Sequence, residues 1–287
     1  MFRSILAAAF IAGATATAFA QDADVVLAVT DVEGLEQLQQ EFGAVEAALE
    51  ASTGLSVELF PVSSRTAAVE AMNSGQVNFV LTGPAEYVVM KELTDAQIVV
   101  AWQRPDYYAQ IVALADSPIK RAADVKGQSV SFGSVGSTSQ HLGPAQALAD
   151  LGLEYANDYD AQIIRRNVAI EALIRGDIAA VGMNRGHLER ARAAYPDVAF
   201  RVVARGPDLP NDILVAAPDV PANVFEAVKT AFVDDGEAMM EAVLVGEDND
   251  KYEGGFFLSS VNDADYDYVR DMYRTIGVPS FSAFVGD

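Results

Sequence analysis

Short apolar segments alternate with longer amphipathic segments along this sequence, and the alternation occurs in two series. Strands that alternate with helices form right-handed crossovers, which place the strands side by side in a parallel sheet. The first series predicts strands over 25–29, 56–60 and 77–81, with helices over 35–52 and 65–74. The second predicts strands over 129–132, 160–164, 178–183 and 200–204, with helices ending at 150, 175 and 194. The pattern therefore predicts an α/β fold with two sheets.

Two extended segments connect the two series. One spans 98–115 around Arg104-Pro105, and the other follows the break at 206–210 and continues as a strand over 212–217. Two crossings between two lobes make a hinge, and a ligand binds between the lobes of such a protein. We expect the two-lobed architecture of a type II periplasmic binding protein, each lobe a sheet flanked by helices and joined by a two-strand hinge. The predicted division is a signal peptide (1–20), lobe 1 (21–112 and 211–287) and lobe 2 (113–210).

The last predicted helix, 263–276, carries five apolar or aromatic residues at helical spacing. This pattern predicts packing against the core rather than a binding surface. The five residues are Tyr266, Val269, Met272, Tyr273 and Ile276.

The first twenty residues have the pattern of a secretory signal peptide. Arg3 precedes a short apolar run over 5–13, and Ala18-Phe19-Ala20 forms a small-residue cleavage site. The run is too short for a transmembrane helix, which needs about 20 apolar residues. The chain has no cysteine, so it has no disulfide, thiolate metal site, cysteine nucleophile or lipid-bearing cysteine. We predict a periplasmic protein that is not lipid-anchored and does not insert into the membrane.

The chain is strongly acidic, with 41 acidic and 19 basic residues and a formal net charge of −22. Loss of Arg3 with the signal peptide changes this charge to −23. Such a charge repels nucleic acid and anionic membrane surfaces, so neither is expected as a partner. An anion would need a strong local cluster of donors in this protein.

The best candidate for such a cluster follows the strand 129–132. A loop of glycine and serine leads into Ser137, Thr138 and Ser139 at the start of a helix. The N–H groups and dipole of a helix N-terminus attract anions, and three hydroxyls add further donors. Hydroxyl side chains also cap helices without any ligand, so both interpretations remain open.

Two arginines and several polar residues extend this candidate site. Arg65 and Arg166 each open a helix, where a cation is disfavoured by about 0.3–1 kcal/mol unless an anion compensates it. The alternative for each arginine is a solvated surface position. Further candidates near the starts of predicted elements are Tyr87, Tyr107, Tyr108 and Asp212. Tyrosines also pack in cores, and Asp212 is equally suited to capping a hinge turn.

Signals for catalysis are weak. His141 and His187 lack the spacing of metal ligands, and no nucleophile, base and orienting group occur together. We expect a binding protein without a cofactor, not an enzyme.

The sequence resembles the PhnD-like periplasmic binding proteins of phosphonate, phosphite and phosphate ABC importers. The resemblance covers nearly all of the mature chain, and the Ser-Thr-Ser loop and the Pro-Asn-Asp turn are its most specific pieces. The matching segments are Thr82-Gly83-Pro84-Ala85-Glu86-Tyr87, Asp116-Ser117-Pro118-Ile119, Asp124-Val125-Lys126-Gly127, Gly136-Ser137-Thr138-Ser139, Leu188-Glu189-Arg190, Tyr195-Pro196, Arg201-Val202-Val203 and Leu209-Pro210-Asn211-Asp212. The resemblance implies that Ser137, Thr138 and Ser139 grip phosphoryl oxygens and that Tyr107 and Asp212 line the cleft.

Four positions depart from the family pattern. Gln140 replaces a glycine after the loop, Arg65 replaces a tyrosine, Arg166 replaces a histidine, and Gly186 replaces an acidic residue of aminoalkylphosphonate binders. We therefore expect a compact and strongly charged oxyanion: phosphonate, phosphite, phosphate or a phosphate ester. The expected partner is an inner-membrane ABC permease, and a monomer is expected.

Three other functions remain open from the sequence. The first is the binding of another ligand, which is a carboxylate, a sulfonate or a ferric ion held by Tyr107 and Tyr108. An exported hydrolase and the ligand domain of a sensor are the remaining alternatives.

Overall fold

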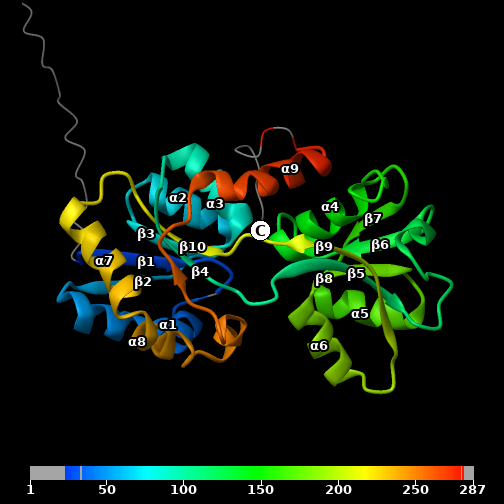
Figure 1. The fold of residues 1–287 in the computed structure, drawn as a ribbon, viewed down its shortest axis with the longest axis horizontal. Coiled ribbons are helices and arrows are strands. Elements are labelled where there is room, and N and C mark those ends of the chain that lie inside the picture. Colours follow the sequence, from blue (N-terminus) through cyan, green and yellow to red (C-terminus); the bar gives the residue numbers. More distant parts are fainter. Residues whose placement is uncertain (1–22, 33, 279, 281–287) are drawn as a thin grey trace, which may run out of the picture.

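The computed structural model describes residues 23–32, 34–278 and 280, and the predicted signal peptide lies outside them. Two sheets lie side by side, each flanked by helices, and extended segments connect them (Figure 1). The predicted two-lobed α/β architecture is confirmed. None of the helices in the described residues combines the length and apolar character of a bilayer-spanning segment.

The first sheet has six strands in the order β11-β4-β10-β3-β1-β2. Their bounds are β1 Val25–Val29, β2 Val57–Phe60, β3 Phe79–Thr82, β4 Gln97–Trp102, β10 Asp212–Ala216 and β11 Phe257–Leu258. Strands β2, β1 and β3 run parallel, whereas β10 is antiparallel to both β3 and β4.

The second sheet has five strands in the order β7-β6-β8-β5-β9. Their bounds are β5 Tyr108–Leu114, β6 Ser129–Phe132, β7 Asp160–Ile163, β8 Ala180–Asn184 and β9 Phe200–Asp208. Strands β7, β6 and β8 run parallel, and β5 is antiparallel to β8 and β9. Each sheet is therefore mixed rather than wholly parallel, because the first strand after each crossing enters the new sheet in the opposite direction.

The helices follow the strands of their own lobe. The first lobe contains α1 Leu35–Thr53, α2 Arg65–Asn73, α3 Pro84–Thr94, α7 Ala222–Asp234, α8 Gly236–Val243, η3 Glu247–Tyr252, η4 Asp263–Tyr266 and α9 Asp267–Thr275. The second contains η1 Ala122–Val125, η2 Thr138–Leu142, α4 Gly143–Ala149, α5 Arg166–Arg175 and α6 Arg185–Ala194.

The chain crosses between the sheets twice. It leaves the first sheet after Trp102 and enters the second at Tyr108, and it returns between Asp208 and Asp212. All of β5 belongs to the second sheet, so the first change of sheet occurs before the predicted position near residue 112. The lobe boundaries themselves remain a prediction.

The break predicted at 206–210 begins later than expected, because β9 continues through Gly206 and Pro207 to Asp208. Two features make proline acceptable there: β9 is an edge strand, and its pairing with β5 shifts register twice.

The C-terminal helix α9 contacts both lobes (Figure 1). Tyr273 donates a hydrogen bond to the carbonyl of Ala85 in the first lobe at 3.0 Å. Thr275 donates to Gln146 of α4 in the second lobe. The packing role predicted for this segment is confirmed, since Tyr266, Val269, Met272 and Tyr273 are fully buried.

Candidate ligand-binding site between the lobes

The predicted hydroxyl loop follows β6 and turns sharply at Gly136. The φ of Gly136 is 76°, a left-handed conformation that favours glycine. The chain then enters a π-helical turn at η2, which continues directly into α4. Ser137, Thr138 and Ser139 are all buried, and the Ser137 hydroxyl makes no capping hydrogen bond. The capping alternative therefore does not describe Ser137 in this structure.

Thr138 joins the two lobes. Its Oγ1 accepts a hydrogen bond from the backbone N–H of Ala85 at 3.0 Å, at the start of α3. The approach is close at Gly83, where a Cβ atom would lie 2.7 Å from Glu86 Oε2 and 3.8 Å from Thr138 Oγ1. Glycine at this position therefore leaves room for the Glu86 carboxylate, while Thr138 of the other lobe stays at van der Waals distance.

Ser139 lies between two polar side chains. Asn184 Nδ2 donates to Ser139 Oγ at 3.1 Å, and Tyr107 is hydrogen-bonded to the same serine. Burial raises the pKa of Tyr107 to about 12, against the opposing effect of Arg104. The phenol therefore remains protonated and able to donate at physiological pH.

His141 holds the loop in shape through hydrogen bonds of both its ring nitrogens. The N–H of Gly136 donates to His141 Nδ1 at 3.1 Å, and His141 Nε2 lies 2.9 Å from the hydroxyl of Tyr155. Burial lowers the pKa of His141 to about 4. The imidazole is therefore neutral at pH 7, with an unprotonated Nδ1 that accepts from the loop and an Nε2–H that donates to Tyr155.

Arg65 is nearly buried and pairs with two carboxylates of its own lobe. It contacts Asp31 Oδ1 at 2.6 Å and forms an ion pair with Glu86. Burial opposes the charged form, but Glu86 and Asp31 raise the pKa of Arg65 above its usual value. Burial also raises the pKa of Glu86, to about 7, and Arg65 opposes this effect. The guanidinium expected to compensate an oxyanion thus already has acidic partners.

Asp212 is held by two groups that frame the hinge. Arg104 NH1 lies 3.2 Å from its Oδ1 and 3.3 Å from its Oδ2, and Tyr252 donates to Oδ2 at 2.7 Å. The guanidinium of Arg104 also stacks on the ring of Tyr107 at 3.7 Å from its centroid. Asp212 is therefore neutralised by Arg104, a residue that the sequence analysis did not select.

Arg166 has a different environment. It opens α5 and is partly buried, and within the described residues it has no ion pair closer than 4 Å. Burial lowers the pKa of its guanidinium, and the nearby charge of Arg190 lowers it further.

Two of the predicted tyrosines lie apart from the loop. Tyr87 donates to Asp263 at 2.8 Å and packs on Tyr266 with ring centroids 4.5 Å apart. The ring of Tyr108 stacks under the guanidinium of Arg205, at 3.7 Å from the centroid. Tyr87, expected to face the ligand, is instead a core residue, and Tyr108 has an arginine partner that differs from that of Tyr107.

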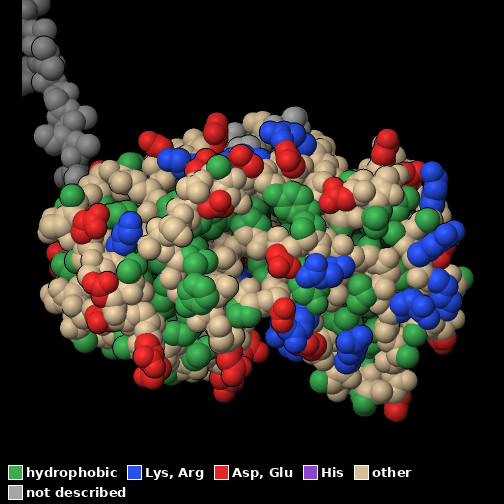
Figure 2. Space-filling model, in the orientation of Figure 1, with side chains coloured by type: hydrophobic (Ala, Val, Ile, Leu, Met, Phe, Trp, Pro, Cys, Tyr) green, Lys and Arg blue, Asp and Glu red, His purple; other side chains and the backbone are tan. Residues whose placement is uncertain are grey.

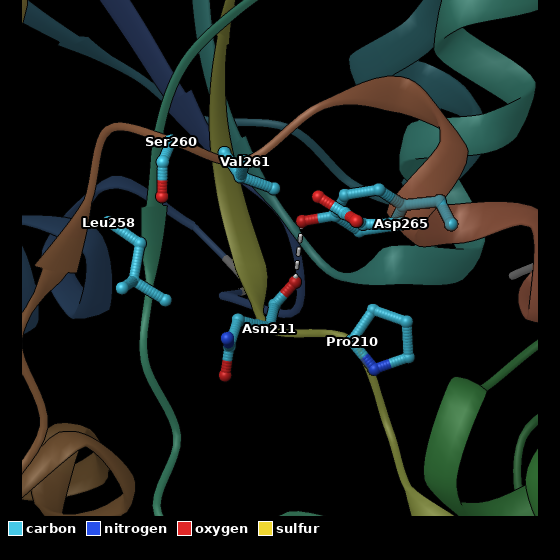
Figure 3. Close-up of a pocket in the computed structure, with 7 residues that line it drawn as sticks. Pro210, Asn211, Leu258, Ser260, Val261 and Asp265 are labelled. Atoms are coloured by element: carbon cyan, nitrogen blue, oxygen red, sulfur yellow. Dashed lines mark hydrogen bonds between the residues drawn. The ribbon is translucent and has the colours of Figure 1, made fainter.

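A small pocket of about 190 Å³ lies beside the hinge (Figure 3). It is lined by Pro210, Asn211, Leu258, Ser260, Val261, Asp265 and Tyr266, and Tyr266 donates to the carbonyl of Asn211 at 3.1 Å. No residue of the hydroxyl loop lines it. We place the candidate site at the loop instead, because the polar donors converge there.

Charge is divided unequally between the lobes. Residues 108–208 contain 11 basic and 11 acidic residues, whereas the rest of the chain contains 8 basic and 30 acidic residues. Lys and Arg side chains gather on the second lobe, and the molecule is hollowed between the two halves (Figure 2). The second lobe, which carries the hydroxyl loop, is therefore free of the net negative charge that would repel an anion.

Comparison with known proteins identifies the family. Residues 27–254 match the family model of the periplasmic substrate-binding protein of phosphonate ABC transporters. The chain belongs to this family. It is the periplasmic substrate-binding component of an ABC transporter, and its family and fold are those of binding proteins rather than enzymes.

Solved structures share the fold. PhnD1 from Prochlorococcus marinus, in complex with methylphosphonate, aligns with a TM-score of 0.69 at 17% identity, over 88% of this chain and 98% of that one. A phosphonate transporter component from Pseudomonas aeruginosa aligns with a TM-score of 0.64 at 18% identity, over 86% and 84%. The aliphatic sulphonate binding protein SsuA from Escherichia coli aligns with a TM-score of 0.60 at 17% identity, over 92% of each chain.

Two departures from the family pattern have a local explanation. Gln140 folds over Gly133, where a Cβ atom would lie 2.7 Å from that of Gln140. The glycine thus makes room for the glutamine. At Gly186 the nearest atoms to an added Cβ belong to Asn184, at 3.8 Å, and Arg190, at 4.0 Å. No described neighbour fills the space that a side chain at this position would take.

Sequence reasoning missed several site residues. Asn184 contacts Ser139, Glu86 contacts Arg65, and Arg104 contacts Asp212. One signal was present for Asn184: it directly follows the predicted strand 178–183, and residues at that end of a parallel strand face the ligand crevice. Arg104 lies inside the extended segment 98–115, where no periodic pattern marks it.

Proposed function

We propose that this protein captures a small phosphoryl oxyanion between its lobes and delivers it to an inner-membrane permease. The hydroxyl loop carries the proposal: Ser137, Thr138 and Ser139 are buried together at the start of a helix, and one of them is bonded to the opposite lobe. Hydroxyl and backbone donors at a helix N-terminus are suited to an anion. The ligand class is phosphonate, phosphite, phosphate or a phosphate ester.

Each residue has a proposed role. Ser137 and Ser139 donate to phosphoryl oxygens, and Tyr107 donates beside Ser139. Arg166 supplies positive charge, because it has no close acidic partner in the described residues. Thr138 contributes to closure through Ala85. Arg65 and Asp212 act indirectly, by holding Glu86 and Arg104 in place. Tyr87 and Tyr108 are left out of the proposed site.

Hinge closure is part of the proposal. The Thr138–Ala85 hydrogen bond forms only when the lobes meet, and two extended crossings allow them to separate. We infer that the mature chain works as a monomer, since both walls of the site come from one chain. The periplasmic family supports export through the predicted signal peptide.

A sulfonate is the second candidate, favoured by the sulphonate-binding protein that shares the fold. Sulfonates and phosphonates have the same tetrahedral oxygen arrangement, but a sulfonate carries only one negative charge. A ferric ion fits less well, because Tyr107 and Tyr108 stack on different arginines.

Titration calorimetry of the mature protein tests the proposal. We expect methylphosphonate or another phosphoryl compound to bind at least tenfold more tightly than methanesulfonate. Ser139→Ala is expected to weaken that binding at least fivefold. Ser129→Ala is the matched control, because its hydroxyl donates to Asp160 at the other end of the same strand. If no phosphoryl compound binds, the proposed function is wrong.

A further inference from the structure

Two cations on opposite lobes have no close acidic partner among the described residues. Arg166 opens α5 in the second lobe, and Lys251 lies in η3 of the first lobe. Within the described residues, neither has an ion pair closer than 4 Å. The Lys251 ammonium folds over the ring of Tyr252, 5.1 Å from its centroid, and Tyr252 reaches the hinge residue Asp212.

A buried histidine is close enough to both cations for their charges to act on it. His187 is 9% exposed, and its ring Nδ1 has no hydrogen-bond partner among the described residues. Burial first, and then the charges of Arg166, Arg190, Arg104 and Lys251, lower the pKa of His187 well below its usual value. Four positive charges therefore lie around one neutral imidazole, which has an unused polar atom.

Acidic groups near this cluster already have other partners. Asp212 is held by Arg104 and Asp31 by Arg65. Asp248 accepts from Gln37 at 3.3 Å, and Asp250 lies 3.9 Å from Arg190. Arg166 receives longer-range attraction from Asp248 and Asp31, and Lys251 receives it from Asp212 first and then from Asp31 and Asp248. At Arg166 the dipole of α5 adds a further unfavourable positive potential.

The cluster adjoins the hydroxyl loop through a single side chain. Asn184 donates to Ser139 through Nδ2 and accepts from the backbone N–H of His187 through Oδ1, at 3.1 and 2.9 Å. One small ligand bound at Ser139 can therefore extend toward His187.

We propose that Arg166 and Lys251 bind a second negative group of the ligand, so that the substrate class is phosphoryl compounds that also carry a carboxylate. This inference rests on the proposed function, because the hydroxyl loop must hold the phosphoryl group. The planar guanidinium of Arg166 can pair with both oxygens of a carboxylate, and Lys251 would contact the same carboxylate from the other lobe. His187 supplies a neutral polar wall.

Three matched ligands test the inference: phosphonoacetate, methylphosphonate and 2-aminoethylphosphonate. By calorimetry on the mature protein, we expect phosphonoacetate to bind at least tenfold more tightly than methylphosphonate, and 2-aminoethylphosphonate to bind most weakly. Lys251→Gln and Arg166→Gln should each reduce the phosphonoacetate preference at least fivefold, whereas Lys251→Arg should retain it. Arg175→Gln is the control, since this arginine lies at the far end of α5 and pairs with Asp177.

The possible failures are distinguishable. If methylphosphonate binds and phosphonoacetate binds no better, the second site is wrong and the proposed function stands. If neither compound binds, the inference is wrong, and the proposed function fails with it only if phosphite, phosphate and phosphate esters do not bind either. An unchanged preference in both Lys251→Gln and Arg166→Gln also overturns the inference, because the preference would then come from other residues.

Discussion

Replacement of Thr138 by valine isolates one hydrogen bond that links the lobes. Valine has nearly the same shape as threonine but lacks the hydroxyl. The N–H of Ala85 would lose the acceptor that it has at 3.0 Å and would stay buried in the closed protein. In the open protein the same N–H is solvated by water, so the variant penalises closure more than folding.

The size of this effect follows from the cost of an unpaired buried donor. Such a group costs about 1–3 kcal/mol, and each 1.4 kcal/mol changes an affinity tenfold. Because binding requires closure, Thr138→Val should weaken methylphosphonate binding by roughly 5-fold to 150-fold. Thr138→Ser retains the oxygen and should stay within about threefold of the parent protein.

Calorimetry gives the affinities, and small-angle scattering shows whether saturating ligand still compacts the variant. Urea unfolding of the ligand-free protein supplies the control, with an expected change below about 1 kcal/mol. Equal affinity of the valine variant and the parent protein would show that the Thr138–Ala85 hydrogen bond contributes nothing to closure.

Three further predictions concern single positions. Gly83→Ala should weaken methylphosphonate binding at least tenfold by calorimetry, because the new Cβ would lie 2.7 Å from the Glu86 carboxylate. An affinity equal to that of the parent protein would show that the Glu86 side chain moves aside without cost. Gly186→Glu should tighten binding of 2-aminoethylphosphonate at least threefold in the same assay, since it restores a carboxylate where space is open. Burial lowers the pKa of His141 to about 4, so the unfolded chain binds a proton that the folded protein does not; stability should be full above about pH 6.5 and fall by up to about 3 kcal/mol toward pH 4. Urea unfolding across this pH range should show a smaller loss of stability in His141→Gln than in the parent protein. An identical pH profile of the two proteins would show that His141 is not the group whose protonation destabilises the fold.

The fold was largely predictable because local patterns report it. Strand β6 and helix α6 begin where apolar runs and helix signals place them, and the glycine and hydroxyl residues around Gly136 mark a turn into a helix. Helix α3 was not predicted, because it follows β3 after only Gly83 and its residues read equally well as an apolar extension of the strand.

The electrostatic partners could not be predicted from local sequence. Arg65 looked uncompensated at a helix start, yet tertiary folding brings it against Asp31 and Glu86. Asp212 was expected to line the cleft or to cap a hinge turn, and its pairing with Arg104, 108 residues away along the chain, was not foreseen. Such pairings depend on the register of separate strands, which no local pattern records.

A crystal structure of the mature protein with methylphosphonate would show where the phosphoryl group binds. We expect it between the lobes, with its oxygens within hydrogen-bond distance of at least two of the hydroxyls of Ser137, Thr138 and Ser139. A phosphoryl group bound elsewhere, with all three hydroxyls more than 4 Å away, would show that the hydroxyl loop is not the ligand site.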